Sequence, residues 1–328
     1  LVVAAPLPPD TAVVLFTSGS TGSPRGIAIS RAALVAAAAS SAAHLPFRDD
    51  DRWLACLPLA HSGGLAIVVR CLVARRPVVL HERDFDAPAV ARLAAERRAT
   101  LASLVPAQLD ALLPHLHDAQ LRAILLGGAP ATPAQLAAAR HLPVHRTYGL
   151  TETFGQIATA REPGAPLVAL PGVALAAGTA AAPQRIRIRT AQLATAYLDG
   201  PPIAPELVTA DLGYLDDHDA LHVVGRADDV IISGGENVHP AEIEAILAAT
   251  AGVRAACAFG IPDPRWGQVV GAALVVSAAF DRAAAEATWR ATLAPHARPR
   301  RLALVAELPA LPSGKPDRRA AAALAAVK

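Results

Sequence analysis

Short apolar runs alternate with longer alanine-rich or amphipathic stretches along the first half of the chain. The short runs are rich in valine, leucine and alanine, which is typical of buried strands. They are Ala12–Phe16, Arg52–Leu57, Pro77–Leu80, Leu101–Leu104, Ala123–Leu126 and Val144–Thr147. The longer stretches have the composition of helices, and Ser30 can cap the first of them. They are Arg31–Ala43, Gly63–Leu72, Ala87–Arg97, Pro106–Leu113 and Pro133–Ala139. This alternation predicts a parallel, doubly wound sheet that is covered by helices on both faces.

The pattern changes after Arg161. Proline, glycine and short strand-like runs continue to Ala210, which predicts a small, partly antiparallel subdomain. A second module of about a hundred residues follows, a usual size for a small domain. It contains helices near Pro240–Ala249 and Arg282–Leu293 and strands near Arg254–Phe259 and Ala272–Val276. We therefore expect an α/β protein with a large domain over residues 1–227, made of mostly parallel sheets plus the β-rich subdomain. A small α+β domain would cover residues 228–328.

Composition narrows the classes of partner. The 328 residues are 53% hydrophobic and carry 30 basic and 28 acidic side chains, so the net charge of +2 favours neither nucleic acid nor a membrane surface. No apolar stretch is long enough to span a bilayer. The cysteines Cys56, Cys71 and Cys257 are widely separated, which predicts a reducing, cytoplasmic setting. Because only Lys315 and Lys328 are lysines, an internal lysine indicates a place that needs a compact ammonium. The chain lacks methionine and begins at Leu1, so we expect that its true start was trimmed or uses an unusual initiator.

A loop of glycines and hydroxyls follows the first predicted strand. Glycine lets backbone N–H groups approach a ligand closely, and the hydroxyls add donors, so such a loop suits the oxygens of a polyphosphate. Its residues are Thr17, Ser18, Gly19, Ser20, Thr21 and Gly22. Neither G-x-x-x-x-G-K-[ST] nor G-x-G-x-x-G is present. A solvated Ser/Gly loop is the alternative, but the continuation Ser23-Pro24-Arg25-Gly26 into apolar residues favours the phosphate loop.

Four predicted strands end in polar or glycine-rich segments. Ligands of parallel α/β sheets collect at the carboxyl ends of the strands, so these segments are expected to meet at one edge. They are Thr17–Gly22, Pro58–His61, Gly127–Pro130 and Tyr148–Thr153.

The run T-S-G-S-T-G-S-P-R-G resembles the phosphate-loop signature of the acyl-adenylating superfamily, in which Lys usually stands where this chain has Arg25. The segments S-L-V-P-A-Q-L, T-Y-G-L-T-E-T-F-G-Q-I and I-S-G-G-E-N-V-H-P-A-E-I-E look most like the o-succinylbenzoate:CoA ligases of menaquinone synthesis. Benzoate-type aryl-CoA ligases share the last segment and Arg265–Gln268, so they remain rivals. The resemblance covers residues 11–319, but the N-terminal subdomain usual in the family is nearly absent.

The resemblance implies a nucleotide site. Glu152 would bind magnesium, with Thr151 beside it facing phosphate. Tyr148 would stack on adenine. Asp211 and Arg226 would hold the ribose hydroxyls. The face where nucleobase and acyl group meet would be lined by Gly127, Gly128 and Ala129. Alone, Glu152 would be read as a solvated carboxylate and Asp211 as a turn former.

The resemblance also implies a mobile catalytic segment. Lys315, in P-S-G-K-P-D-R, would bridge the substrate carboxylate and the α-phosphate, the alternative being a solvated basic tail. Asp228 would be the hinge between the domains. Gly234 and Gly235 would belong to the loop that presents coenzyme A, and His61 would gate the acyl pocket.

The expected activity is thus an ATP- and Mg²⁺-dependent acid:CoA ligase that passes through an acyl-adenylate. Its expected partners are a small carboxylic acid, ATP and CoA, with no nucleic acid, no membrane insertion and a possible homodimer. The alternatives are another aryl- or acyl-CoA ligase, and a catalytically weak nucleotide-binding protein on the same scaffold.

Overall fold

A computed structural model describes residues 7–17, 25–310 and 316–326. Its largest sheet has eleven strands in the order β10-β11-β13-β14-β9-β8-β7-β6-β5-β3-β4. The strands β3 to β7 pair in parallel, as the alternating pattern predicts. Their bounds are β3 Trp53–Ala55, β4 Val78–Leu80, β5 Leu101–Leu104, β6 Ala123–Leu126 and β7 Val144–Leu150.

The other strands of the large sheet are antiparallel and continue it beyond β7. They are β8 Gly155–Ala160, β9 Leu167–Ala169, β10 Val173–Ala176, β11 Gln184–Thr190, β13 Leu207–Leu215 and β14 Leu221–Arg226. The region expected to form a small β-rich subdomain is therefore antiparallel, but most of its strands join the same sheet instead of forming a separate one. The α/β class is confirmed.

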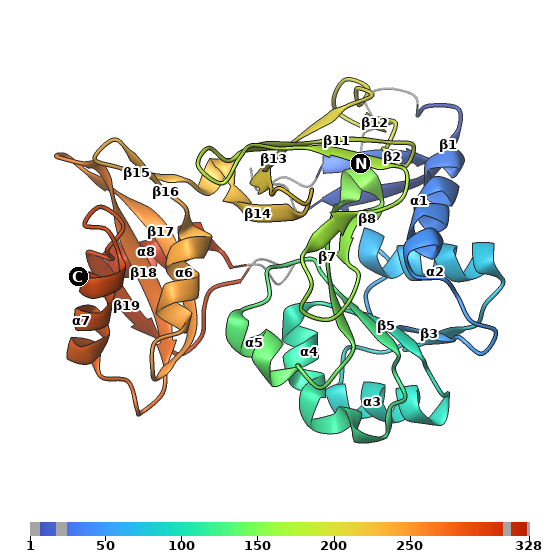
Figure 1. Cartoon of the computed structure of the whole chain (residues 1–328), viewed down its shortest axis with the longest axis horizontal. Coiled ribbons are helices and arrows are strands. Elements are labelled where there is room, and N and C mark those ends of the chain that lie inside the picture. The colour runs from blue at the N-terminus through green and yellow to red at the C-terminus, as the bar shows by residue number, and fades with distance from the viewer. Residues whose placement is uncertain (1–6, 18–24, 311–315, 327–328) are drawn as a thin grey trace.

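The helices of the large unit pack around its sheets, with α1 beside α2 and the strand β2, Arg25–Ser30 (Figure 1). They are α1 Arg31–His44, α2 Ser62–Ala74, α3 Ala87–Glu96, α4 Pro106–Leu112 and α5 Pro133–Ala138. The 3₁₀ turn η1 (Leu113–Asp118) follows α4, and the 3₁₀ turn η2 (Thr151–Thr153) follows β7. Ser30 caps α1 as expected, because its Oγ accepts the N–H of Ala33 at 3.1 Å. The buried core contains Trp53, whose indole N–H donates to Ser103 Oγ at 3.1 Å, so the polar end of the ring is satisfied.

The first strand lies outside the parallel sheet that the alternating pattern predicts for it. β1 (Thr11–Thr17) pairs antiparallel with β2 (Arg25–Ser30), and β2 pairs with β12 (Ala196–Tyr197) in a separate three-stranded sheet. The prediction that β1 enters the parallel sheet was wrong, because the residues after the phosphate loop return as a strand. The phosphate loop thus leaves from a hairpin beside the large sheet.

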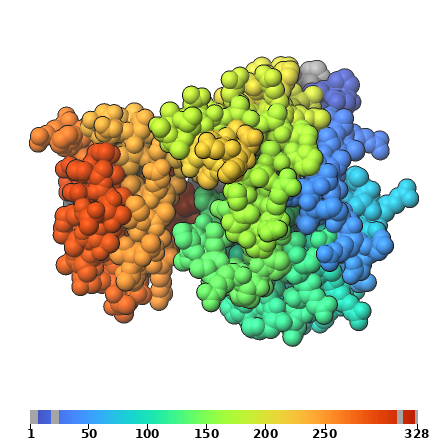
Figure 2. Space-filling model, in the orientation of Figure 1, coloured from blue at the N-terminus to red at the C-terminus, as the bar shows by residue number. Residues whose placement is uncertain are grey.

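Within the described residues, the small unit is a five-stranded sheet with three helices, coloured orange to red in Figure 1. It comprises β15 Ile231–Ser233, β16 Glu236–Val238, α6 Pro240–Ala248, β17 Val253–Asp263, β18 Gly267–Val276, α7 Arg282–Thr292, β19 Arg301–Val305 and α8 Arg318–Ala326. The 3₁₀ turn η3 (Ala227–Asp229) connects it to β14. Figure 2 shows the small unit as a body distinct from the large one. The boundary between residues 227 and 228 stays a prediction.

Candidate active site

Several predicted site residues lie outside the described part of the chain. They are Ser18, Gly19, Ser20, Thr21, Gly22 and Lys315. The remaining predicted residues are described, and most of them fall into three groups. One group surrounds Glu152, one surrounds Asp211, and one lies at and beyond the η3 turn.

Glu152 is held by a tightly constrained turn at the end of β7. Thr153 is fully buried, and its Oγ1 accepts the N–H of Leu150 at 3.2 Å. A Cβ on Gly149 would overlap the carbonyl oxygen of Gly155, so only glycine allows β7 and β8 to approach here. Phe154 closes the turn with a left-handed φ of 50°. The turn leaves Glu152 partly exposed beside the hairpin that carries the phosphate loop.

Tyr197, which the sequence argument missed, contacts Glu152. Its hydroxyl donates to Glu152 Oε1 at 3.2 Å, and the Arg25 guanidinium lies 3.9 Å from the centre of its ring. Burial, followed by the negative charge of Glu152, raises the pKa of Tyr197 to about 12. A signal was present, because the chain has only three tyrosines. Arg25 and Thr17 are paired across the β1–β2 hairpin, so both flank the phosphate loop as expected.

Tyr148, the predicted adenine-stacking residue, lies together with Asp211 and Arg226, the predicted ribose contacts. The Tyr148 hydroxyl donates to Asp211 Oδ2 at 2.6 Å, and Arg226 Nη1 lies 3.6 Å from Asp211 Oδ1. Asp211 and Arg226 are direct partners in the β13–β14 ladder. Burial and the neighbouring carboxylate raise the pKa of Tyr148, so its hydroxyl remains a donor.

The glycines after β6 lie against the same strand. A Cβ on Gly127 would overlap Thr147 Oγ1, the residue before Tyr148, and Gly128 has a φ of 80°. Gly128 therefore requires glycine for its backbone conformation, whereas at Gly127 the Thr147 side chain leaves no room for a Cβ. Ala129 follows them in the loop before α5. The role of these residues in lining a nucleotide site stays a prediction.

His61 occupies the N-cap position of α2. Its side chain is exposed, and within the described part of the chain it makes no capping hydrogen bond. The role of His61 at the acyl pocket therefore stays a prediction.

Two adjacent aspartates at η3 face opposite units. Asp228 Oδ2 lies 3.4 Å from Arg226 Nη2, and its Oδ1 lies 3.8 Å from Arg185 Nη2, both in the large unit. Asp229 Oδ2 instead accepts from Arg318 Nε at 3.2 Å, on α8 of the small unit. Arg318, also missed from the sequence, pairs in addition with Glu244 of α6. The connection between the units thus runs between two differently anchored carboxylates.

A tight hairpin joins β15 and β16 in the small unit. Its two turn residues, Gly234 and Gly235, have φ of 65° and 88°, which side chains rarely adopt. The N–H of Gly234 donates to the carbonyl of Trp266 at 2.9 Å. The guanidiniums of Arg265 and Arg300 lie 4.8 Å and 5.5 Å from the Trp266 ring centre. An aromatic face and two cations therefore adjoin the glycine turn.

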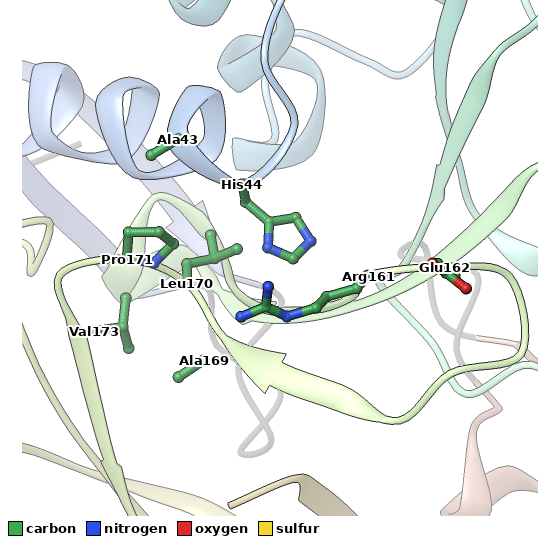
Figure 3. A pocket seen from close by; sticks show the side chains of 8 residues that line it. All are labelled: Ala43, His44, Arg161, Glu162, Ala169, Leu170, Pro171 and Val173. Atoms are coloured by element: carbon green, nitrogen blue, oxygen red, sulfur yellow. The ribbon is translucent and has the colours of Figure 1, made fainter.

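A hollow of about 520 Å³ lies away from these groups, at the other end of β8. It is lined by Ala43, His44, Arg161, Glu162, Ala169, Leu170, Pro171 and Val173. In Figure 3 the His44 ring and the Arg161 side chain point toward the same space. Burial lowers the pKa of His44, and the positive charge of Arg161 lowers it further. None of the predicted site residues lines this hollow.

The donor set suits magnesium held together with phosphates. No group of three or more His, Cys, Asp or Glu side chains that could hold a metal alone is present in residues 7–17, 25–310 and 316–326. Mg²⁺ is commonly bound by one or two carboxylates plus substrate phosphates, so a single glutamate beside a phosphate loop fits it. Glu152 provides that carboxylate.

No helix in the described part of the chain combines the length and apolar character needed to cross a bilayer.

Comparisons with known proteins agree with this geometry. The family model described as "AMP-binding enzyme" matches residues 2–192, and that described as "AMP-binding enzyme C-terminal domain" matches residues 242–315. The 2-succinylbenzoate–CoA ligase of Bacillus licheniformis is 35% identical over 93% of this chain and 68% of its own length.

Solved structures give the same relationship. The o-succinylbenzoate CoA synthetase of Bacillus subtilis in complex with the acyl-adenylate intermediate OSB-AMP superposes with a TM-score of 0.86 and 31% identity, over 95% of this chain and 69% of that one. The same enzyme in complex with ATP and magnesium ion also gives 0.86, at 30% identity, over 96% of this chain and 70% of that one.

Proposed function

Because the chain belongs to the family of AMP-binding enzymes, we propose that it is an AMP-forming acid:CoA ligase that acts on 2-succinylbenzoate in menaquinone biosynthesis. In the first half-reaction a carboxylate oxygen of the acid attacks the α-phosphorus of ATP. The bond between the α- and β-phosphates breaks, and pyrophosphate leaves. In the second, the CoA thiol gives up its proton, its sulfur attacks the acyl carbonyl, and AMP leaves.

One arrangement carries this proposal: a single strand and the turn after it supply both ends of a nucleotide site. Tyr148 on β7 reaches Asp211, whose partner is Arg226, and this group supports binding of the nucleoside. Four residues later Glu152 lies beside Arg25 and the hairpin of the phosphate loop, which supports binding of Mg²⁺ and phosphates. Bound Mg²⁺ would offset the negative charge on the phosphates as pyrophosphate leaves.

The remaining assignments concern the moving parts. Lys315 supplies a positive charge between the acid and the α-phosphate, where negative charge builds during attack. Asp228 is the hinge about which the small unit reorients after adenylation. Thr151 faces the phosphates beside Glu152, and His61 lies at the acyl pocket.

The second half-reaction is supported by the surface around the glycine turn. Arg265 and Arg300, which lie over the Trp266 ring, offer guanidiniums for phosphate groups. Gly234 and Gly235 keep the turn free of side chains. CoA carries phosphates, so this surface suits it.

The identity of the acid is supported by a buried cation. 2-Succinylbenzoate keeps a second carboxylate after activation of the first, whereas benzoate has none. Arg70 on α2 is 7% exposed, its Nη2 donates to Gln156 Oε1 at 3.0 Å, and no carboxylate among the described residues lies within ion-pair distance of it. We assign the second carboxylate to Arg70. A rise in KM for 2-succinylbenzoate in Arg70→Gln, with unchanged KM for ATP, is the expected result, and equal KM values would contradict the assignment.

The test of the activity is pyrophosphate release with ATP and 2-succinylbenzoate, followed by a panel of substituted benzoates. Preference for a benzoate would support an aryl-CoA ligase instead, and no turnover with any acid would support a nucleotide-binding protein. Lys315→Ala is expected to abolish pyrophosphate release while it still forms thioester from supplied acyl-adenylate. Loss of both half-reactions would contradict the role of Lys315.

We also propose that the protein works in the cytoplasm as a homodimer. Cys56, Cys71 and Cys257 are all free and buried, which supports a reducing compartment. Light scattering would test the dimer, and a monomeric mass at micromolar concentration would refute it.

A further inference from the structure

Tyr197 is placed beside Glu152 by an unusually close approach of two backbone segments. The N–H of Leu198 donates to the carbonyl of Gly26 at 2.9 Å, and a Cβ on Gly26 would overlap the Leu198 side chain. Nearby, the N–H of Ala194 donates to the carbonyl of Glu152 at 2.7 Å. Residues 194–198 therefore bind Glu152 at two places. Ala194 bonds to its backbone carbonyl, and Tyr197 bonds to its carboxylate.

Arg25 fixes the ring of Tyr197 from the other side. Its guanidinium lies 3.9 Å from the ring centre, and its Nε is 3.8 Å from Asp199 Oδ1. A planar guanidinium can stack on an aromatic face and still pair with a carboxylate at its edge, whereas an ammonium does not stack in this way. This gives a physical reason for arginine at position 25.

The contact also divides the two oxygens of Glu152 between different tasks. Oε1 accepts a hydrogen bond from the Tyr197 hydroxyl. No described residue makes a hydrogen bond to Oε2. Oε2 is therefore the oxygen available to a ligand. A carboxylate fixed at one oxygen presents the other in a limited range of directions, which lowers the cost of ordering it when a ligand binds.

We propose that Tyr197, stacked under Arg25, is a positioning residue that holds Glu152 so that Oε2 meets the Mg²⁺ of Mg²⁺–ATP. This inference rests on the proposed function, which supplies the metal and the nucleotide. Tyr197 acts through Glu152 and does not itself touch the reacting atoms.

The experiment is calorimetric binding of ATP to the full chain at a series of MgCl₂ concentrations, without any acid, so that no reaction occurs. Tyr197→Phe removes only the hydroxyl. It is expected to raise the Mg²⁺ concentration that gives half-maximal enhancement of ATP binding about tenfold, the effect of losing one hydrogen bond to a charged group. ATP binding without Mg²⁺ is expected to stay unchanged.

Tyr214→Phe is the matched control. The Tyr214 ring stacks on His222 with 4.5 Å between ring centres in the β13–β14 hairpin, and among the described residues its hydroxyl makes no hydrogen bond to Glu152. The Tyr214→Phe variant is expected to show the same Mg²⁺ dependence of ATP binding as the unmodified protein. Arg25→Lys keeps the charge but loses the stacking, and a shift of about threefold is expected.

A double-mutant cycle that combines Tyr197→Phe with Glu152→Gln separates positioning of the Glu152 carboxylate from a general structural effect. In that background Tyr197→Phe is expected to leave the Mg²⁺ dependence of ATP binding unchanged, because the carboxylate it acts through is absent. Equal Mg²⁺ dependence of Tyr197→Phe and the unmodified protein would overturn the inference. So would an equal shift in both backgrounds. Failure of the proposed function would look different: the unmodified protein itself would bind ATP without any response to Mg²⁺.

Discussion

Replacing Arg318 by alanine is expected to loosen the small unit specifically. Arg318 is the first residue of α8, and its guanidinium pairs with Glu244 on α6 and with Asp229 at η3. Its Nη1 also donates to the carbonyl of Ala258 at 2.7 Å. One side chain thus ties the C-terminal helix, a second helix, a strand and the connection between the units.

The magnitude follows from what the substitution leaves behind. The Glu244 side chain is only 19% exposed, and removing one member of a buried ion pair costs about 3–5 kcal/mol. Glu244 keeps the N–H of Ala258 at 2.8 Å, which offsets part of this cost. The Asp229 side chain is 34% exposed, so solvent screens its ion pair with Arg318. Loss of that ion pair adds at most about 1 kcal/mol. We expect a loss of about 3 kcal/mol in the free energy of opening the small unit.

Hydrogen exchange read by mass spectrometry would measure this effect separately in each unit. A loss of about 3 kcal/mol corresponds to roughly 100-fold faster exchange of the amides of β17 and β18, while those of β5 and β6 stay unchanged. Arg282→Ala is the matched control, because Arg282 is 62% exposed and pairs with Glu286 one turn along α7. That change is expected to cost under about 0.5 kcal/mol. If Arg318→Ala speeds exchange no more than Arg282→Ala, the assigned role of the cluster is wrong.

Three further outcomes are expected. Gly149→Ala places a Cβ against the carbonyl of Gly155 and is expected to destabilise the large unit by at least about 3 kcal/mol, measured by urea unfolding; a smaller loss would mean that β7 and β8 can separate. Asp51 is fully buried, and although burial raises its pKa, hydrogen bonds from Arg122 and other donors lower it to about 2. Because its pKa lies below the unfolded value of about 3.9, its stabilisation is present above that pH and about 2 kcal/mol is lost as pH falls toward 2. Asp51→Asn is expected to remove that part of the pH dependence, and an unchanged slope would argue against it. Chelation of divalent cations is expected to stop pyrophosphate release until Mg²⁺ is restored, and release that persists would exclude the metal role of Glu152.

Local patterns in the sequence predicted the elements of the parallel sheet and the cap at Ser30, because propensity and capping depend on neighbouring residues. They could not place β1, since its partner β2 was hidden in a run that also reads as the approach to a helix. Pairing between strands depends on contacts that a local pattern does not contain.

The same limit explains which site residues were found. Tyr148 and Asp211 are 63 residues apart and were joined only through resemblance. Tyr197 and Glu152 are 45 residues apart, and no motif links them. The sequence predicts no role for Arg318, because an arginine that pairs with carboxylates 74 and 89 residues away gives no local signal.

The two neighbouring aspartates of η3 differ in how strongly dissolved salt weakens their ion pairs. Asp228 meets half-exposed guanidiniums of the large unit at 3.4 Å and 3.8 Å, which dissolved salt screens effectively. Asp229 belongs to the partly buried cluster of Arg318, which salt reaches less. Dissolved salt therefore weakens the contacts of Asp228 with the large unit more than those that hold Asp229 to α8.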